Sequence, residues 1–87
     1  MDVDQEIRRR LQSLNPEALE LHDDSAAHAG HAGAAAGGGH FELTVVSAAF
    51  AGQPALARHR QVYRLLADLI PARIHALQIR AFSPDEF

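Results

Sequence analysis

The chain has 87 residues and no cysteine, and its 11 acidic residues outnumber its eight basic ones, all arginine, which gives a net charge of −3. A chain of this length forms one small domain, and without disulfides its stability must come from its core. The acidic balance argues against a dedicated nucleic-acid binder, although residues 51–87 carry five of the arginines, which indicates one basic face.

Two further absences bear on where the protein acts. No apolar run reaches the roughly 18–20 residues that a membrane-spanning helix needs. Residues 1–4 are acidic and lack the basic and apolar regions of a secretory signal. We therefore expect a soluble, cytoplasmic protein that does not contact a membrane.

The first predicted element is a helix. Apolar residues recur at helical spacing from Val3 to Leu14. Asp2 and Gln5, three residues apart, form a capping pair at its start. Asn15-Pro16 ends the helix, because the residue before a proline avoids helical backbone angles.

Two strands and a long loop come next. Residues 19–22 alternate between leucine and polar side chains, which predicts a short strand. Residues 24–39 form a flexible loop rich in His, Gly and Ala, longer than most connections in a compact domain. His40–Ser47 is a second strand, with Phe41, Leu43 and Val45 on one face.

A second helix and a third strand complete the pattern. Pro54 suits the first position of a helix, which Pro71 ends. Its apolar face is predicted from five residues, Leu56, His59, Tyr63, Leu66 and Ile70. Ile74–Phe82 is the third strand, with His75, Leu77 and Ile79 on one face. Ser83-Pro84-Asp85-Glu86 reads as the cap and first turn of a last short helix.

This order of elements predicts an α/β (α+β) fold. The first two strands are most simply antiparallel, whereas the second and third are joined through a helix and are therefore parallel. The result is a three-stranded mixed sheet with the helices packed on one face, in a single domain that spans residues 1–87.

The histidines are the strongest candidates for chemistry. Neutral imidazole is the commonest metal ligand, and a chain without thiols that binds an iron–sulfur or copper centre must obtain sulfur ligands from a partner. His75 stands near the start of a strand, and His28 and His31 lie in the loop that His22 and His40 flank. Two alternatives stay open: His75 as a histidine hydrogen-bonded within the sheet, and the loop histidines as solvated residues or as a metal-buffering site that needs no partner.

Arginines are the second group of candidates. Arg58 and Arg60 flank His59 on more exposed positions, where the three could meet an anionic partner surface. As an alternative function, the chain could bind DNA or another nucleic acid through phosphate contacts from five arginines, Arg58, Arg60, Arg64, Arg73 and Arg80. We predict no enzyme, because no cysteine nucleophile, phosphate-binding loop or dinucleotide fingerprint is present.

Several motifs together resemble the BolA family over nearly the whole chain. They are Asp24-Ser25 with His28, the strand His40–Ser47, Phe50-x-Gly52, Arg58-His59-Arg60-x-Val62-Tyr63, Ile74-His75-Ala76-Leu77 and the end Ser83-Pro84-Asp85-Glu86-Phe87. The resemblance implies a fold similar to the class II KH domain. The KH nucleic-acid loop has the pattern Gly-x-x-Gly, but Gly52 is followed three positions later by Ala55 and not by a second glycine. RNA binding in the KH manner is therefore not expected.

The resemblance also implies a partner and a cofactor. BolA-like proteins share a [2Fe–2S] cluster with monothiol glutaredoxins, which supply a cysteine and a bound glutathione thiolate. Here His75 matches the family's histidine ligand, His28 matches its loop ligand, and His31 is an additional candidate. The implied role is in iron–sulfur cluster assembly or transfer, or in iron homeostasis, with a monomer or weak homodimer when the chain is alone.

Overall fold

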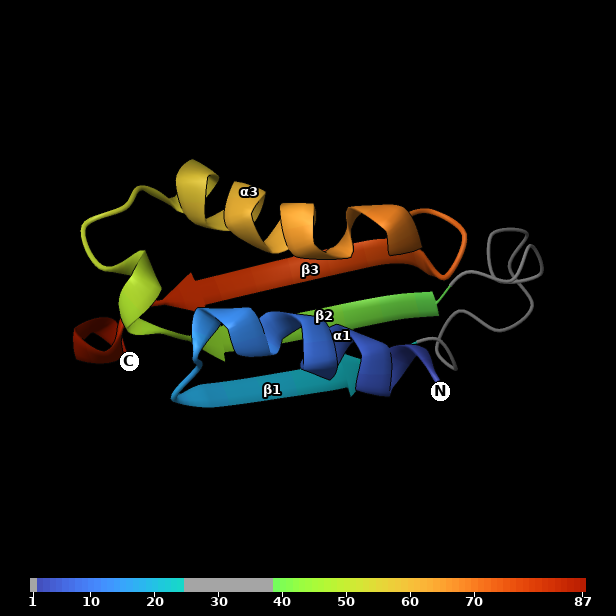
Figure 1. The fold of residues 1–87 in the computed structure, drawn as a ribbon, viewed down its shortest axis with the longest axis horizontal. Helices are drawn as coiled ribbons and strands as arrows, with labels where there is room; N and C mark the ends of the chain where they lie inside the picture. Colours follow the sequence, from blue (N-terminus) through green and yellow to red (C-terminus); the bar gives the residue numbers. More distant parts are fainter. Residues whose placement is uncertain (1, 25–38) are drawn as a thin grey trace.

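The computed structural model describes residues 2–24 and 39–87 of the chain. Two helices and three strands build these parts, with short 3-10 turns between them (Figure 1). In chain order the main elements are α1 (Val3–Leu11), β1 (Ala18–Asp23), β2 (Gly39–Val46), α3 (Ala55–Leu66) and β3 (Ile74–Phe82). The 3-10 turns are η1 (Gln12–Leu14), η3 (Ala48–Phe50), η4 (Ala67–Leu69) and η5 (Pro84–Glu86).

The sheet has the predicted mixed topology. Its strand order is β1-β2-β3, with β1 antiparallel to β2 and β2 parallel to β3. The α+β fold expected from the sequence is therefore confirmed. The predicted loop lies almost wholly outside the described residues, although Gly39, which was assigned to it, belongs to β2.

The ends of the first helix follow from local chemistry. The Asp2 carboxylate accepts a hydrogen bond from the backbone N–H of Gln5 at 2.9 Å, which satisfies one of the free donors at the start of α1. After η1, Asn15 takes a left-handed conformation with φ of 48° and ends the helical segment. The predicted cap and helix end are both confirmed.

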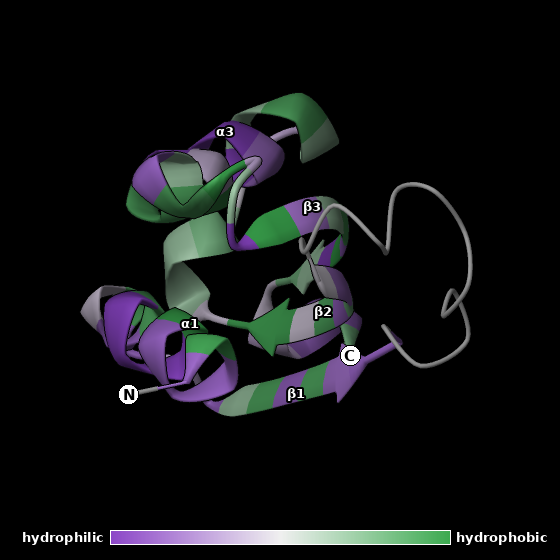
Figure 2. Cartoon of the chain, turned by 90° about the vertical axis from the view of Figure 1, so that its right-hand side faces the viewer, coloured by the Kyte–Doolittle hydropathy of each residue, from purple (hydrophilic) through white to green (hydrophobic). Residues whose placement is uncertain are grey.

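The core lies between the helices and one face of the sheet. Figure 2, viewed along the strands, shows α1 and α3 on the same side of the sheet. The buried side chains that meet there come from every main element except β1, whose leucines pack at the edge. They are Ile7, Leu11, Phe41, Leu43, Val45, Phe50, Val62, Leu66, Leu69, Ile74 and Ile79. The two helices are also linked directly, since Arg10 donates to the Asp68 carboxylate and, at 3.1 Å, to the Leu65 carbonyl.

The apolar face predicted for the second helix is wrong in its rotation. Leu66 is buried as predicted, but Leu56 is 61% exposed and Tyr63 is 40% exposed, while Arg58 and Val62 face the interior. Because arginine is usually a surface residue, the sequence predicted that the neighbouring face of the helix is the buried one. The helix can bury Arg58 because its guanidinium meets several acceptors there.

Arg58 joins three segments of the chain. Its Nε donates to the Gln53 carbonyl at 2.7 Å and its Nη1 to the Ala81 carbonyl at 3.0 Å. Both terminal nitrogens also donate to the Glu86 carboxylate, at 2.5 and 3.0 Å. Glu86 in turn accepts from the backbone N–H of Ser83 at 2.8 Å, which confirms the predicted cap of the last turn. The network holds η5 against α3 and the end of β3.

This network makes a contribution to stability that depends on pH. The Arg58 guanidinium, followed by the Ser83 N–H, lowers the pKa of Glu86 from 4.5 to about 2. Because the pKa is lower in the folded state, the stabilisation is complete above about pH 4.5 and is lost as the pH falls toward 2.

We therefore expect Glu86→Gln to flatten the acid limb of the stability curve. Urea unfolding followed at several pH values between 4.5 and 2 should show a smaller fall in stability for this variant than for the wild type. Glu20→Gln, which removes an exposed carboxylate from β1, is the control for the change in net charge. Parallel curves for the wild type and Glu86→Gln would contradict the assignment.

Candidate metal centre

Two histidines meet at one end of the sheet, which we call the loop end: the end where β1 finishes and β2 and β3 begin (Figure 1). His40 is the second residue of β2 and His75 the second residue of β3. Their ring centroids are 5.2 Å apart, with a 44° angle between the ring planes. The His75 side chain is exposed, and His40 is half-buried.

An irregularity in strand pairing places His75 there. Gly39 pairs with Ile74, but the next residue, His40, pairs with Ala76, so His75 is an extra residue in β3. Such a bulge changes the direction of a side chain locally. Ile74 remains buried before it, and His75 turns out of the core beside His40.

The prediction that His75 shares a face with Leu77 and Ile79 is therefore wrong. Strict alternation along β3 would point His75 toward the core with those two residues. The extra residue breaks the alternation, and His75 is exposed while Ile79 is buried. This correction favours a role as a ligand, because the imidazole is accessible and is held on a strand, not on a loop.

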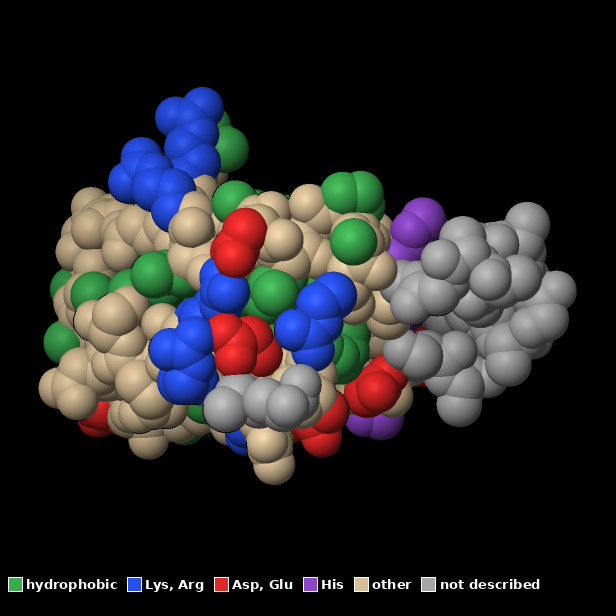
Figure 3. Space-filling model, turned by 45° about the vertical axis from the view of Figure 1, so that its right-hand side comes forward, with side chains coloured by type: hydrophobic (Ala, Val, Ile, Leu, Met, Phe, Trp, Pro, Cys, Tyr) green, Lys and Arg blue, Asp and Glu red, His purple; other side chains and the backbone are tan. Residues whose placement is uncertain are grey.

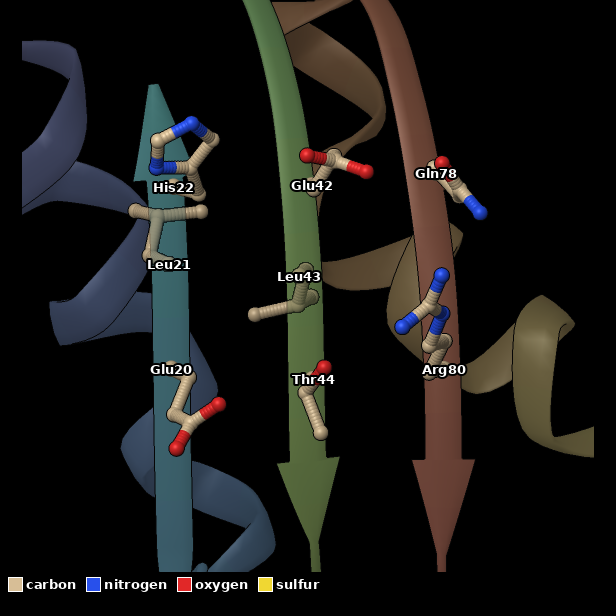
Figure 4. A pocket seen from close by; sticks show the side chains of 8 residues that line it. All are labelled: Glu20, Leu21, His22, Glu42, Leu43, Thr44, Gln78 and Arg80. Atoms are coloured by element: carbon tan, nitrogen blue, oxygen red, sulfur yellow. The ribbon is translucent and has the colours of Figure 1, made fainter. Parts of the chain in front are cut away.

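The face of the sheet opposite the helices is polar. Figure 4 shows Glu20 and His22 on β1, Glu42 and Thr44 on β2, and Gln78 and Arg80 on β3, around a shallow depression. Across the strands, Glu20, Thr44 and Arg80 stand in one row, and the next row leads toward the two histidines. The loop-end histidines thus continue a solvated polar surface.

The predicted arginine contacts separate into different places. Arg58 was expected at an exposed position beside His59, but it is only 9% exposed and is engaged by Glu86, so the expected exposure is wrong. His59 is half-buried, and Arg60 and Arg64 are exposed on α3. Arg80 lies on the polar face of the sheet, away from the helices (Figure 4). The five arginines therefore do not form one surface.

Charged groups elsewhere are largely interleaved. Figure 3 shows arginine side chains projecting at one edge of the molecule and others set among acidic side chains. Arg8, Arg9 and Arg10 of α1 all pair with acidic residues of the same helix, and the hydrogen bonds from Arg9 and Arg10 lower the pKa of Glu6 to about 2. The positive charges of the first helix are thus offset by carboxylates on the same helix.

The set of possible ligands among the described residues is small. His28 and His31 lie outside the described residues. In residues 2–24 and 39–87 no group of three or more His, Cys, Asp or Glu side chains could hold a metal ion. His40 was only a loop-flanking residue in the sequence, since its contact with His75, 35 positions later, depends on the register of two strands. Imidazole nitrogen suits a shared centre whose thiolates come from elsewhere.

Comparisons with known proteins assign the family. The family described as BolA-like protein matches residues 11–86. The chain belongs to the BolA family. BolA-like protein 1 of Mus musculus is 41% identical over 86 residues, a match that covers 98% of this chain and 61% of the mouse protein. SufE-like protein 1 of Arabidopsis thaliana is 43% identical, over 92% of this chain and 23% of the plant protein.

BolA structures share the fold described above. BolA1 from Arabidopsis thaliana superposes with a TM-score of 0.86 at 36% identity, covering all of this chain and 97% of the other.

A third relative by sequence is the DNA-binding transcriptional regulator BolA of Haemophilus influenzae, which is 31% identical over the whole chain and 82% of that protein. The chain spans about a quarter of the SufE-like relative and three fifths of the mouse relative.

Among the described residues, no helix has the length and apolar character needed to cross a membrane.

Proposed function

We propose that this BolA-family protein is a non-catalytic, cytoplasmic partner of a monothiol glutaredoxin in iron–sulfur cluster assembly or transfer, or in iron homeostasis. The observation that carries the proposal is the position of His75. Its imidazole is exposed at the loop end, and the bulge in β3 fixes its direction. In this proposal His75 is the permanent protein ligand to a [2Fe–2S] cluster that the two proteins share.

The donor set of the chain fits half of such a cluster. The chain has no thiol, so the cysteine and glutathione thiolates must come from the partner. The second imidazole comes from His28 in the loop, with His31 as a substitute. Bound imidazole is neutral where thiolate is anionic, so such a cluster has a higher reduction potential than one with four thiolates.

The polar loop end also suits docking. The open face of the sheet carries both acidic and basic groups (Figure 4). His40 lines a neighbouring depression with Glu42 and Gln78, and the His75 ring lies beside the His40 ring. Helices α1 and α3 both cover the opposite face of the sheet (Figure 2), and the His75 side chain is exposed. A partner could therefore bring thiolate ligands to His75 without rearranging the core.

The test is anaerobic co-expression with a monothiol glutaredoxin from the same cell. We expect a coloured one-to-one complex whose visible absorption and circular dichroism spectra differ from those of the glutaredoxin alone. His75→Ala should change these spectra and lower the cluster content of the purified complex several-fold. His22→Ala, an exposed histidine on β1, which β2 separates from β3, is the matched control.

Two results would contradict the proposal. One is the absence of any complex, and the other is a complex whose spectrum is the same with and without His75. Binding between the apo proteins, measured separately, shows whether a loss of colour reflects the loss of a ligand or the loss of docking.

A second candidate function is DNA binding. It is favoured by the name of the Haemophilus influenzae relative and by Arg60 and Arg64, which are exposed and one turn apart on α3. Phosphate contacts would make duplex affinity fall steeply with salt, and a double Arg60→Ala/Arg64→Ala variant would reduce that slope. Such binding without a glutaredoxin complex would place this function first.

A further inference from the structure

The described part of the chain contains a pair of imidazoles that needs no loop and no partner. His40 and His75 approach each other across the β2–β3 ladder, with 5.2 Å between their ring centroids. Each stands on a strand of the central sheet, and the two strands are hydrogen-bonded to each other. Their separation is therefore set by the backbone pairing of β2 with β3.

The bulge at the start of β3 is the reason the pair exists. In an unbroken ladder the residue before Ala76 would point toward the core, while His40, opposite Ala76, points to the open face. The extra residue turns His75 to the same side as His40. A bulge that leaves two histidines in contact at the end of a sheet has the form of a constructed site.

We propose that His40 and His75 together bind a divalent transition-metal ion that prefers imidazole, such as zinc, in the chain alone. Two imidazoles on one tetrahedral zinc, with Zn–N bonds of about 2.0–2.1 Å, hold their ring centres about 5 Å apart. The observed 5.2 Å agrees with this geometry. The inference concerns a different metal from the proposed shared cluster, and the two sites have only His75 in common.

The site has two protein ligands in the described structure. No group of three or more possible ligand side chains occurs in residues 2–24 and 39–87, so the two imidazoles leave coordination positions open. A site with open positions of this kind binds zinc more weakly than a closed four-ligand structural site. It leaves room for a further ligand from a bound molecule.

The competing explanation is zinc binding by His28 and His31 in the loop. Zinc titration of the chain alone, at about pH 7.5 where free imidazole is mostly neutral, distinguishes the two sites. Calorimetry gives affinity and stoichiometry, and the histidine ring signals in NMR spectra identify the ligands. The variants are His40→Gln, His75→Gln, the double variant His28→Ala/His31→Ala, and the control His22→Gln.

We expect one zinc ion per chain, with ring shifts at His40 and His75. His40→Gln and His75→Gln should each weaken binding by about tenfold or more, because even loss of an outer-shell partner costs 10–100-fold. The loop double variant and His22→Gln should bind as the wild type does. Backbone amide spectra verify that each variant is folded, and His40→Asn replaces His40→Gln if the latter is not.

Two outcomes overturn the inference. Loss of zinc binding in the loop double variant shows that the pair does not hold the metal by itself, whatever His40→Gln does. The absence of zinc binding by the wild-type chain excludes the site altogether. Neither result depends on a glutaredoxin, so the zinc titration and the cluster experiment can fail independently of each other.

Discussion

Phe50→Ala is expected to lower the free energy of unfolding by about 3–5 kcal/mol, the usual cost of removing a buried phenylalanine ring. Phe50 is fully buried in η3, between the end of β2 and the start of α3. Its ring fills the core that both helices share with the sheet. Since small domains have only about 5–15 kcal/mol of stability in total, this loss is a large share.

Urea unfolding monitored by circular dichroism measures the effect of Phe50→Ala. The midpoint should fall while the slope of the transition stays close to that of the wild type. Leu56→Ala is the matched control, because Leu56 is 61% exposed on α3 and its loss should change stability by less than about 0.5 kcal/mol. Similar losses in the two variants would show that Phe50 does not anchor the core.

The second large effect is expected at Arg58. Arg58→Leu removes four hydrogen bonds, two to backbone carbonyls and two to Glu86, and leaves those acceptors without their donor. Broken buried networks are among the few causes of severe destabilisation. We expect the melting temperature to fall by about 10 °C or more, in a domain of a size where such shifts are readily resolved.

Hydrogen exchange and a conservative variant locate the effect of Arg58. The amides of residues 83–87 should exchange faster in Arg58→Leu, because η5 loses its attachment to α3. Arg58→Lys should recover only part of the stability, since one ammonium group cannot reproduce the fork of the guanidinium. Arg60→Leu, at an exposed neighbouring position, should leave the melting temperature within a few degrees of the wild type. Equal effects of Arg58→Leu and Arg60→Leu would refute the network.

The elements of the fold were accessible from the sequence because their signals are local. The spacing from Val3 to Leu14, the cap at Asp2 and the alternation around Phe41 depend on residues within one or two turns of each other. The strand directions followed from the length and type of each connection. The family motifs added the expectation that His75 carries chemistry.

The rotation of α3 could not be predicted in the same way. Hydrophobicity favoured the face with Leu56 and Tyr63, but the helix buries Arg58 because acceptors from the nearby Gln53 and from two distant residues, Ala81 and Glu86, converge on it. The residue pattern of one helix gives no information about the Ala81 carbonyl of β3 or about the Glu86 carboxylate, which lies 28 positions after Arg58.

The sequence by itself determined that this protein is a small mixed α/β domain without thiols, so that any thiolate ligand of a metal centre must come from a partner. Only the tertiary structure decided which imidazoles meet. The pairing of β2 with β3 inserts one extra residue at His75, and this shift turns its side chain from the core to the side of His40. Register depends on contacts between residues far apart in the chain, whereas periodicity reports only on neighbours. The contact between His40 and His75 follows from register, so periodicity could not predict it.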